Sequence, residues 1–181
     1  MRSIIVALCV FAAACSGQGL DSPTSPSAMN PAAGLKAQGG TELPFSGSFT
    51  STGSSVTNCP PTCPPTTHQV TADHEGTATY LGRFTSTSLD VVNMATTAST
   101  GTFTFTAANG DQLVATTVGA QSEFIPPNIA KPRLVADIVS GTGRFAGATG
   151  TFTIELVLVI DFAAATHTGT GSFEGLINLN R

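Results

Sequence analysis

Charged residues are scarce in this sequence. They make up 10% of its 181 residues, well below the roughly 25% of an average soluble domain. Only seven are lysine or arginine, and the formal net charge is −4. A nucleic-acid interface needs clustered cations that displace counterions from the phosphates. We therefore expect no nucleic-acid partner.

Strong helix formers are also few, and no stretch shows the apolar stripe of an amphipathic helix. Leucine, glutamate and lysine are uncommon, whereas threonine, valine, phenylalanine and isoleucine are abundant, a balance that favours strands. Threonine, serine, glycine and asparagine take the place of the missing charges, as suits the outer faces of exported β-proteins. The composition predicts the all-β class.

Familiar catalytic motifs are missing as well. The glycine-rich segment 140–150 has no lysine for a phosphate and lies between expected strands, so it is not a P-loop. No G-x-S-x-G nucleophile elbow occurs among the many serines. His68, His74 and His167 are too scattered to indicate a metal site, and we interpret Asp73-His74-Glu75 as solvated residues at a strand entrance. We expect no cofactor and no metal, and we assign no catalytic residue.

No apolar run is long enough to cross a bilayer as a helix, which needs about 20 residues. The shorter run Ile4–Phe11 follows Arg2 and precedes three alanines, the pattern of a secretory signal. These alanines directly precede Cys15 and resemble the bacterial lipobox, although Ala12 stands where leucine is usual. We predict a signal peptide at 1–14 and lipidation of Cys15, with plain secretion as the alternative.

The four cysteines fit this interpretation. Cys9 leaves with the signal peptide and Cys15 takes the lipid, so Cys59 and Cys63 remain as an even pair. Within Cys-Pro-Pro-Thr-Cys they are predicted to form a disulfide that closes a small ring on an exposed loop. A metal site that includes His68, or a redox pair, is the alternative.

A segment rich in glycine, serine, proline and alanine runs from Cys15 to residue 44. It has no hydrophobic periodicity, so it is predicted to be a flexible tether. Ser16 after the lipidated cysteine resembles the signal that lets Gram-negative lipoproteins reach the outer membrane. We expect an outer-membrane lipoprotein of a bacterial envelope, with secretion as the alternative, whose tether holds a domain at 45–181.

Period-2 alternation begins at Phe45 and predicts eight strands. Asn109-Gly110 predicts a type I′ hairpin turn, in which both residues take positive φ, and residues 125–132 predict a proline-rich connection. Long strands with tight turns favour one closed antiparallel barrel, either packed or holding one small ligand. The expected strands are 44–52, 75–87, 89–94, 101–107, 112–118, 133–139, 151–162 and 168–179.

One parity of the strands is expected to face the lumen. Glu155 and Asp161 share the other parity of the longest strand and are expected at the surface. If the barrel is turned the other way, Glu155 becomes a buried carboxylate. The side chains predicted to line a cavity are Phe84, Phe103, Phe105, Phe152, Ile154, Leu156, Leu158 and Phe173.

Segment 140–150, read with 80–85 and 108–111, resembles the allene oxide cyclase barrel-like and dirigent-like superfamily. There a segment G-G-T/S-G-x-F-x-G-A-x-G joins two strands. The resemblance implies an eight-stranded antiparallel barrel, sometimes oligomeric, with a mostly apolar cavity. No catalytic residue is carried over, because the family's acidic residues have no matching motif at the start of this domain. The matching positions, expected to form a tight connection with Phe145 as an inward plug, are Gly141, Gly143, Phe145, Gly147 and Gly150.

These observations favour a non-enzymatic, lipid-anchored barrel that binds a small apolar ligand or a protein partner. A cyclase or isomerase working in the cavity is one alternative, and a packed structural module is the other. A cavity of several hundred Å³ would favour binding or catalysis. A buried acid with a raised pKa beside it would favour the enzyme.

Overall fold

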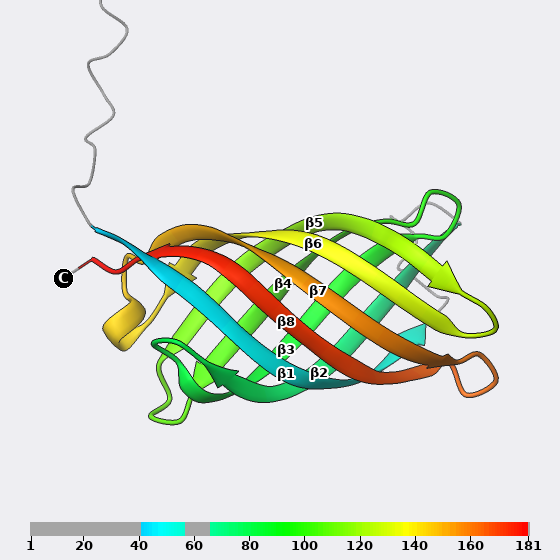
Figure 1. Cartoon of the computed structure of the whole chain (residues 1–181), viewed down its shortest axis with the longest axis horizontal. Coiled ribbons are helices and arrows are strands. Elements are labelled where there is room, and N and C mark those ends of the chain that lie inside the picture. Colours follow the sequence, from blue (N-terminus) through cyan, green and yellow to red (C-terminus); the bar gives the residue numbers. More distant parts are fainter. Residues whose placement is uncertain (1–40, 57–65, 181) are drawn as a thin grey trace, which may run out of the picture. The chain divides into compact units, whose positions relative to one another are not determined.

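The computed structural model of the chain is a closed barrel of eight antiparallel strands in sequence order (Figure 1). It describes residues 41–56 and 66–180, and none of the helices there is long and apolar enough to cross a membrane. Each strand pairs with the next, and β8 pairs with β1 to close the barrel. The predicted fold class is confirmed. The strands are β1 (Glu42–Val56), β2 (Thr67–Ala78), β3 (Gly82–Asn93), β4 (Ala98–Ala107), β5 (Gln112–Ile125), β6 (Ile129–Gly141), β7 (Thr149–Asp161) and β8 (Thr166–Asn178).

Two of the eight predicted strands were divided wrongly. The run 75–87 is broken by a turn at Tyr80, whose φ is 62°, so its halves belong to β2 and β3. The predicted strand 89–94 is the end of β3. The first half of β2 was missed because polar side chains interrupt its apolar alternation. A turn without a typical turn dipeptide therefore shifted the strand boundaries but left the count unchanged.

The proline-rich connection is also shorter than predicted. β5 continues to Ile125 and β6 begins at Ile129, so only residues 126–128 connect them. Pro132 lies inside β6, beside a register shift between Gln121 and Glu123, where proline's missing N–H is tolerated. At the start of the barrel, β1 begins at Glu42, so residues 42–44 belong to the first strand and not to the tether.

The predicted hairpin between β4 and β5 has a different turn from the one expected. Gly110 has a φ of +87°, but Asn109 does not take a positive φ. The Gly110 N–H donates to the carbonyl of Ala107 at 2.8 Å, as in a type I turn followed by a residue in the left-handed region. Asp111 then accepts hydrogen bonds from the Asn109 side chain at 2.8 Å and from the backbone N–H of Arg144 at 3.3 Å. These bonds hold the pKa of Asp111 below its ordinary value.

The family-like segment closes one end of the barrel, which we call the closed end. Its short 3-10 helix η1 (Gly143–Phe145) places the Phe145 side chain inside, with no exposed surface. Gly141 has no side chain, and a Cβ there would overlap Phe145. Gly143, Gly147 and Gly150 have positive φ values of 54°, 72° and 145°. The start of β1 and the end of β8 lie at this same end (Figure 1).

Aromatic side chains pack the half of the barrel next to the closed end. Phe173 is 3% exposed, and its ring lies within 6.4 Å of five other phenylalanine rings, measured between centroids. Glycines make room for these rings: a Cβ at Gly171 would overlap Phe49, and one at Gly47 would overlap Phe173. Five side chains that were predicted to line a cavity do not line it, because they pack against one another in this core. They are Phe84, Phe105, Phe152, Ile154 and Phe173.

Candidate ligand-binding cavity

The other half of the barrel contains a cavity of about 330 Å³, within the size range of small-molecule sites. It lies at the end opposite η1, which we call the open end. Odd-numbered strands contribute residues near their ends and even-numbered strands residues near their starts. Of the predicted lining residues, Phe103, Leu156 and Leu158 are found there. Side chains therefore do not fill the interior of the barrel completely.

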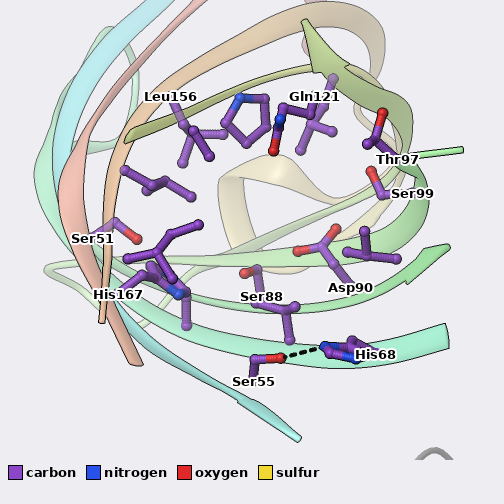
Figure 2. A pocket seen from close by; sticks show the side chains of 18 of the residues that line it. Ser51, Ser55, His68, Ser88, Asp90, Thr97, Ser99, Gln121, Leu156 and His167 are labelled. Atoms are coloured by element: carbon purple, nitrogen blue, oxygen red, sulfur yellow. Dashed lines mark hydrogen bonds between the residues drawn. The ribbon is translucent and has the colours of Figure 1, made fainter. Parts of the chain in front are cut away.

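The cavity has one apolar and one polar wall. β6 and β7 present only apolar side chains and form the apolar wall. β8, β1, β2 and β3 form the polar wall, in which Val70, Ala72 and Val92 lie among the polar side chains. Figure 2 shows Leu156 across the cavity from Ser88 and Asp90. Such a division suits a ligand with an apolar body and hydrogen-bonding groups along one side. The apolar wall consists of Ala130, Pro132, Leu134, Leu156, Leu158 and Ile160, and the polar side chains of the polar wall are those of His167, Ser51, Ser55, His68, His74, Ser88 and Asp90.

A row of buried polar side chains crosses three strands of the polar wall. Ser51 of β1 is the cross-strand neighbour of His74 of β2, which is the neighbour of Ser86 of β3. All three are at most 3% exposed. Ser51 Oγ, His74 Nδ1 and Ser86 Oγ have no hydrogen-bond partner within the described part of the chain. Buried polar atoms are almost always hydrogen-bonded, so these three atoms are an exception. Ser51 and His74 line the cavity, whereas Ser86 does not.

His74 is held as a neutral side chain. Its Nε2 lies 3.2 Å from Ser88 Oγ, and its ring stacks on Phe103 at 5.1 Å. Burial lowers its pKa to about 4, helped by repulsion from His167 and opposed by Asp73. The interpretation of His74 as a solvated residue was therefore wrong. As expected from strand alternation, the His74 side chain points away from those of Asp73 and Glu75. It points into the barrel, however, and not to solvent.

Asp90 faces the cavity from β3 and is the only carboxylate among the described residues that line it. Its Oδ1 accepts a hydrogen bond from Thr117 Oγ1 of β5 at 3.3 Å. Burial raises its pKa to about 6, against the opposing effect of hydrogen bonds from Thr117 and Ser88. Gly101 of β4 lies between the two strands, and a Cβ there would overlap the Asp90 carboxylate. The missing side chain at residue 101 thus provides the space that this acid occupies.

The two remaining histidines also line the cavity. His167 of β8 is 8% exposed, and burial lowers its pKa. Its ring lies against Gly53 of β1, where a Cβ would overlap it. His68 Nδ1 lies 3.2 Å from Ser55 Oγ (Figure 2). Within residues 41–56 and 66–180, no three His, Cys, Asp or Glu side chains form a group that could hold a metal ion.

Sequence reasoning missed the polar wall, although a signal for it was present. Phe84 was expected to face inward, and Ser86, Ser88 and Asp90 share its parity on β3. Treating 75–87 and 89–94 as separate strands hid that continuity. Glu155, by contrast, is exposed as expected and pairs with Arg133 at 3.5 Å.

Three predicted modification sites lie outside the described residues. They are Cys15, in the predicted lipobox, and the predicted disulfide partners Cys59 and Cys63. Asp161, the other acid expected at the surface, is exposed and accepts hydrogen bonds from the backbone N–H groups of Ala163 and Ala164.

No protein-family model and no curated protein sequence matches this chain. Among solved structures, that of the pterocarpan synthase dirigent protein GePTS1 is similar, with a TM-score of 0.51 and 15% sequence identity. The likeness covers 91% of this chain and 100% of that chain. At this identity it shows the fold alone. The chain has a dirigent-like barrel.

Proposed function

We propose that the barrel binds a small molecule, with an apolar body and a polar side, in the cavity at its open end. The observation that carries this proposal is the pairing of an apolar wall with buried polar atoms that lack partners. Leaving such an atom unsatisfied costs about 1–3 kcal/mol. A ligand that reaches Ser51 and His74 would remove part of that cost while it covers the apolar wall.

Filling the cavity tests this proposal. Ala130 is 3% exposed and belongs to the apolar wall, so Ala130→Phe would occupy the space that a ligand needs. The neutral fluorophore N-phenyl-1-naphthylamine should bind the unaltered protein with a saturable rise in emission, and the variant should show none. The protein has no tryptophan, so its own emission is low.

Ala98→Phe is the matched control. Ala98 is exposed at the start of β4 and does not line the cavity, so its variant should bind the fluorophore like the unaltered protein. Equal binding by all three proteins, or by none, would contradict the proposal. Native mass spectrometry of the protein purified from its host should also reveal a bound small molecule.

A cyclase or isomerase activity is the second candidate, and Asp90 is the observation that favours it. A carboxyl with a pKa near 6, inside a cavity, can both donate and accept a proton near neutral pH. If the barrel is an enzyme of this kind, the co-purified molecule incubated in heavy water should gain carbon-bound deuterium. The Asp90→Asn variant should not support that exchange. Recovery of the molecule without deuterium would leave binding as the function.

We also propose that the protein is a lipoprotein of the bacterial envelope, anchored through Cys15. The apolar run and alanines before Cys15, and the even cysteine pair left after it, support this location. The Cys15→Ser variant should move from the membrane fraction to the soluble fraction. The unaltered protein should carry the added mass of acyl chains on residue 15. An unmodified residue 15 in the mature protein would overturn the anchor.

A further inference from the structure

In the part of the chain that the structure describes, the cavity wall carries one acidic side chain and no lysine or arginine. The acidic side chain is that of Asp90, the one carboxylate that the strands of residues 41–56 and 66–180 turn toward the cavity. Arg83 is at the start of β3, next to the closed end. The other described cations form ion pairs away from the cavity: Lys131 with Glu123 at 2.7 Å, Arg133 with Glu155 at 3.5 Å and Arg144 with Asp111 at 3.8 Å.

The residues paired with Asp90 across the sheet, Val70 of β2 and Gly101 of β4, carry no charge. β4 presents Gly101, and β5 presents Thr117 and Gln121. The titratable side chains on the wall are the three histidines of β2 and β8. Burial lowers the pKa of His74 and of His167, so neither carries a positive charge at pH 7. His68 is hydrogen-bonded to Ser55.

On the basis of the proposed binding function, we propose that the ligand is a small amine whose ammonium group pairs with the Asp90 carboxylate. Its apolar body would lie against the wall of β6 and β7, which contains Leu134 and Leu156. A partly buried charge is unfavourable unless it is paired, and the ligand supplies the missing cation. An anionic ligand, such as a fatty acid, would meet repulsion from Asp90 and no cation.

This pairing makes binding depend on pH. The pKa of Asp90 is about 6, and only the ionised carboxylate attracts an ammonium group. Acidification from pH 7 to pH 5 should therefore weaken amine binding about tenfold, because the protonated carboxyl must lose its proton before pairing. Protonation of His74 at still lower pH acts in the same direction, since its positive charge would repel the ligand.

Three probes of matched shape test the inference by isothermal titration calorimetry: 2-phenylethylamine, 2-phenylethanol and 3-phenylpropanoate. At pH 7 the amine should bind about tenfold more tightly than the alcohol, and the carboxylate most weakly. The Asp90→Asn variant should lose this preference for the amine while it keeps its affinity for the alcohol. Asparagine retains an oxygen for the Thr117 hydroxyl, so the variant should fold.

Asp137→Asn is the matched control. Asp137 is an exposed carboxylate on β6 that accepts a hydrogen bond from Thr151 on the outer surface, so its loss should leave amine binding unchanged. Equal affinity for amine and alcohol, or no binding of the amine while N-phenyl-1-naphthylamine still binds, would overturn the inference but not the proposed function. Failure of the fluorophore and of all three probes to bind would overturn both.

Discussion

The Asp90→Asn variant is expected to be more stable than the unaltered protein at pH 7. Folding raises the pKa of Asp90 from 3.8 to about 6. At about 1.4 kcal/mol per pKa unit, keeping this carboxylate charged in the folded state costs about 3 kcal/mol at neutral pH. Asparagine removes that cost and can still accept the hydrogen bond from Thr117. The free energy of unfolding in urea at pH 7 measures the gain.

The gain should disappear in acid. Between pH 6 and pH 3.8 the folded protein holds the Asp90 proton and the unfolded chain does not, so acidification stabilises the fold through this group. His74 acts in the opposite direction. Its pKa falls from 6.5 to about 4 on folding, so between these values the unfolded chain binds the proton and acidification destabilises the fold.

The two effects nearly cancel in the unaltered protein, so its stability changes little with pH. The lowered pKa of His167 adds a loss of stability in acid. The Asp90→Asn variant lacks the compensating group. Its stability should therefore fall by about 3 kcal/mol from pH 7 to pH 4 and meet that of the unaltered protein there. A difference between the two proteins that does not change with pH would show that Asp90 is not a buried, titrating acid.

The Phe173→Ala variant is expected to lose about 3–5 kcal/mol of stability, the usual cost of removing a buried phenylalanine. Phe173 lies at the centre of the packed half of the barrel. Its ring centroid is 4.9 Å from that of Phe45 and 5.3 Å from that of Phe152. The surrounding rings belong to strands that are fixed by the closed sheet, so they cannot collapse into the vacated space. Equilibrium unfolding in urea at pH 7 measures the loss.

The control for this variant is Phe162→Ala. Phe162 follows β7 and is 65% exposed, so its removal should change the free energy of unfolding by less than about 0.5 kcal/mol. A loss at Phe173 as small as that at Phe162 would mean that the aromatic cluster does not stabilise the barrel.

Most of the barrel could be predicted from the sequence because closed antiparallel sheets keep a strict alternation. The pattern placed Phe103 and Leu156 inside and Glu155 outside, where the structure has them. The turn at Tyr80 could not be found in the same way. A non-glycine residue takes a positive φ there. The turn is also joined to a distant part of the chain, by the hydrogen bond from the backbone N–H of Ser46 to Thr79 Oγ1.

The polar wall was harder to predict, because pattern analysis equates an inward side chain with an apolar one. His74 and Asp90 violate that rule, and residues that break local patterns are often functional. Their neighbours come from strand register, which one sequence does not reveal. Gly101 is 11 positions from Asp90 in the chain, yet it is the residue paired with Asp90 across the sheet.

The polar wall spans the seam where the first and last strands meet. Ser51 belongs to β1 and His167 to β8. The imidazole of His167 packs against Gly53 of β1. A chain that lacks β8 therefore lacks part of the wall, so the proposed ligand site is complete only when β8 is paired with β1. The proposed ligand, in contact with both β1 and β8, would in turn slow the separation of these two strands.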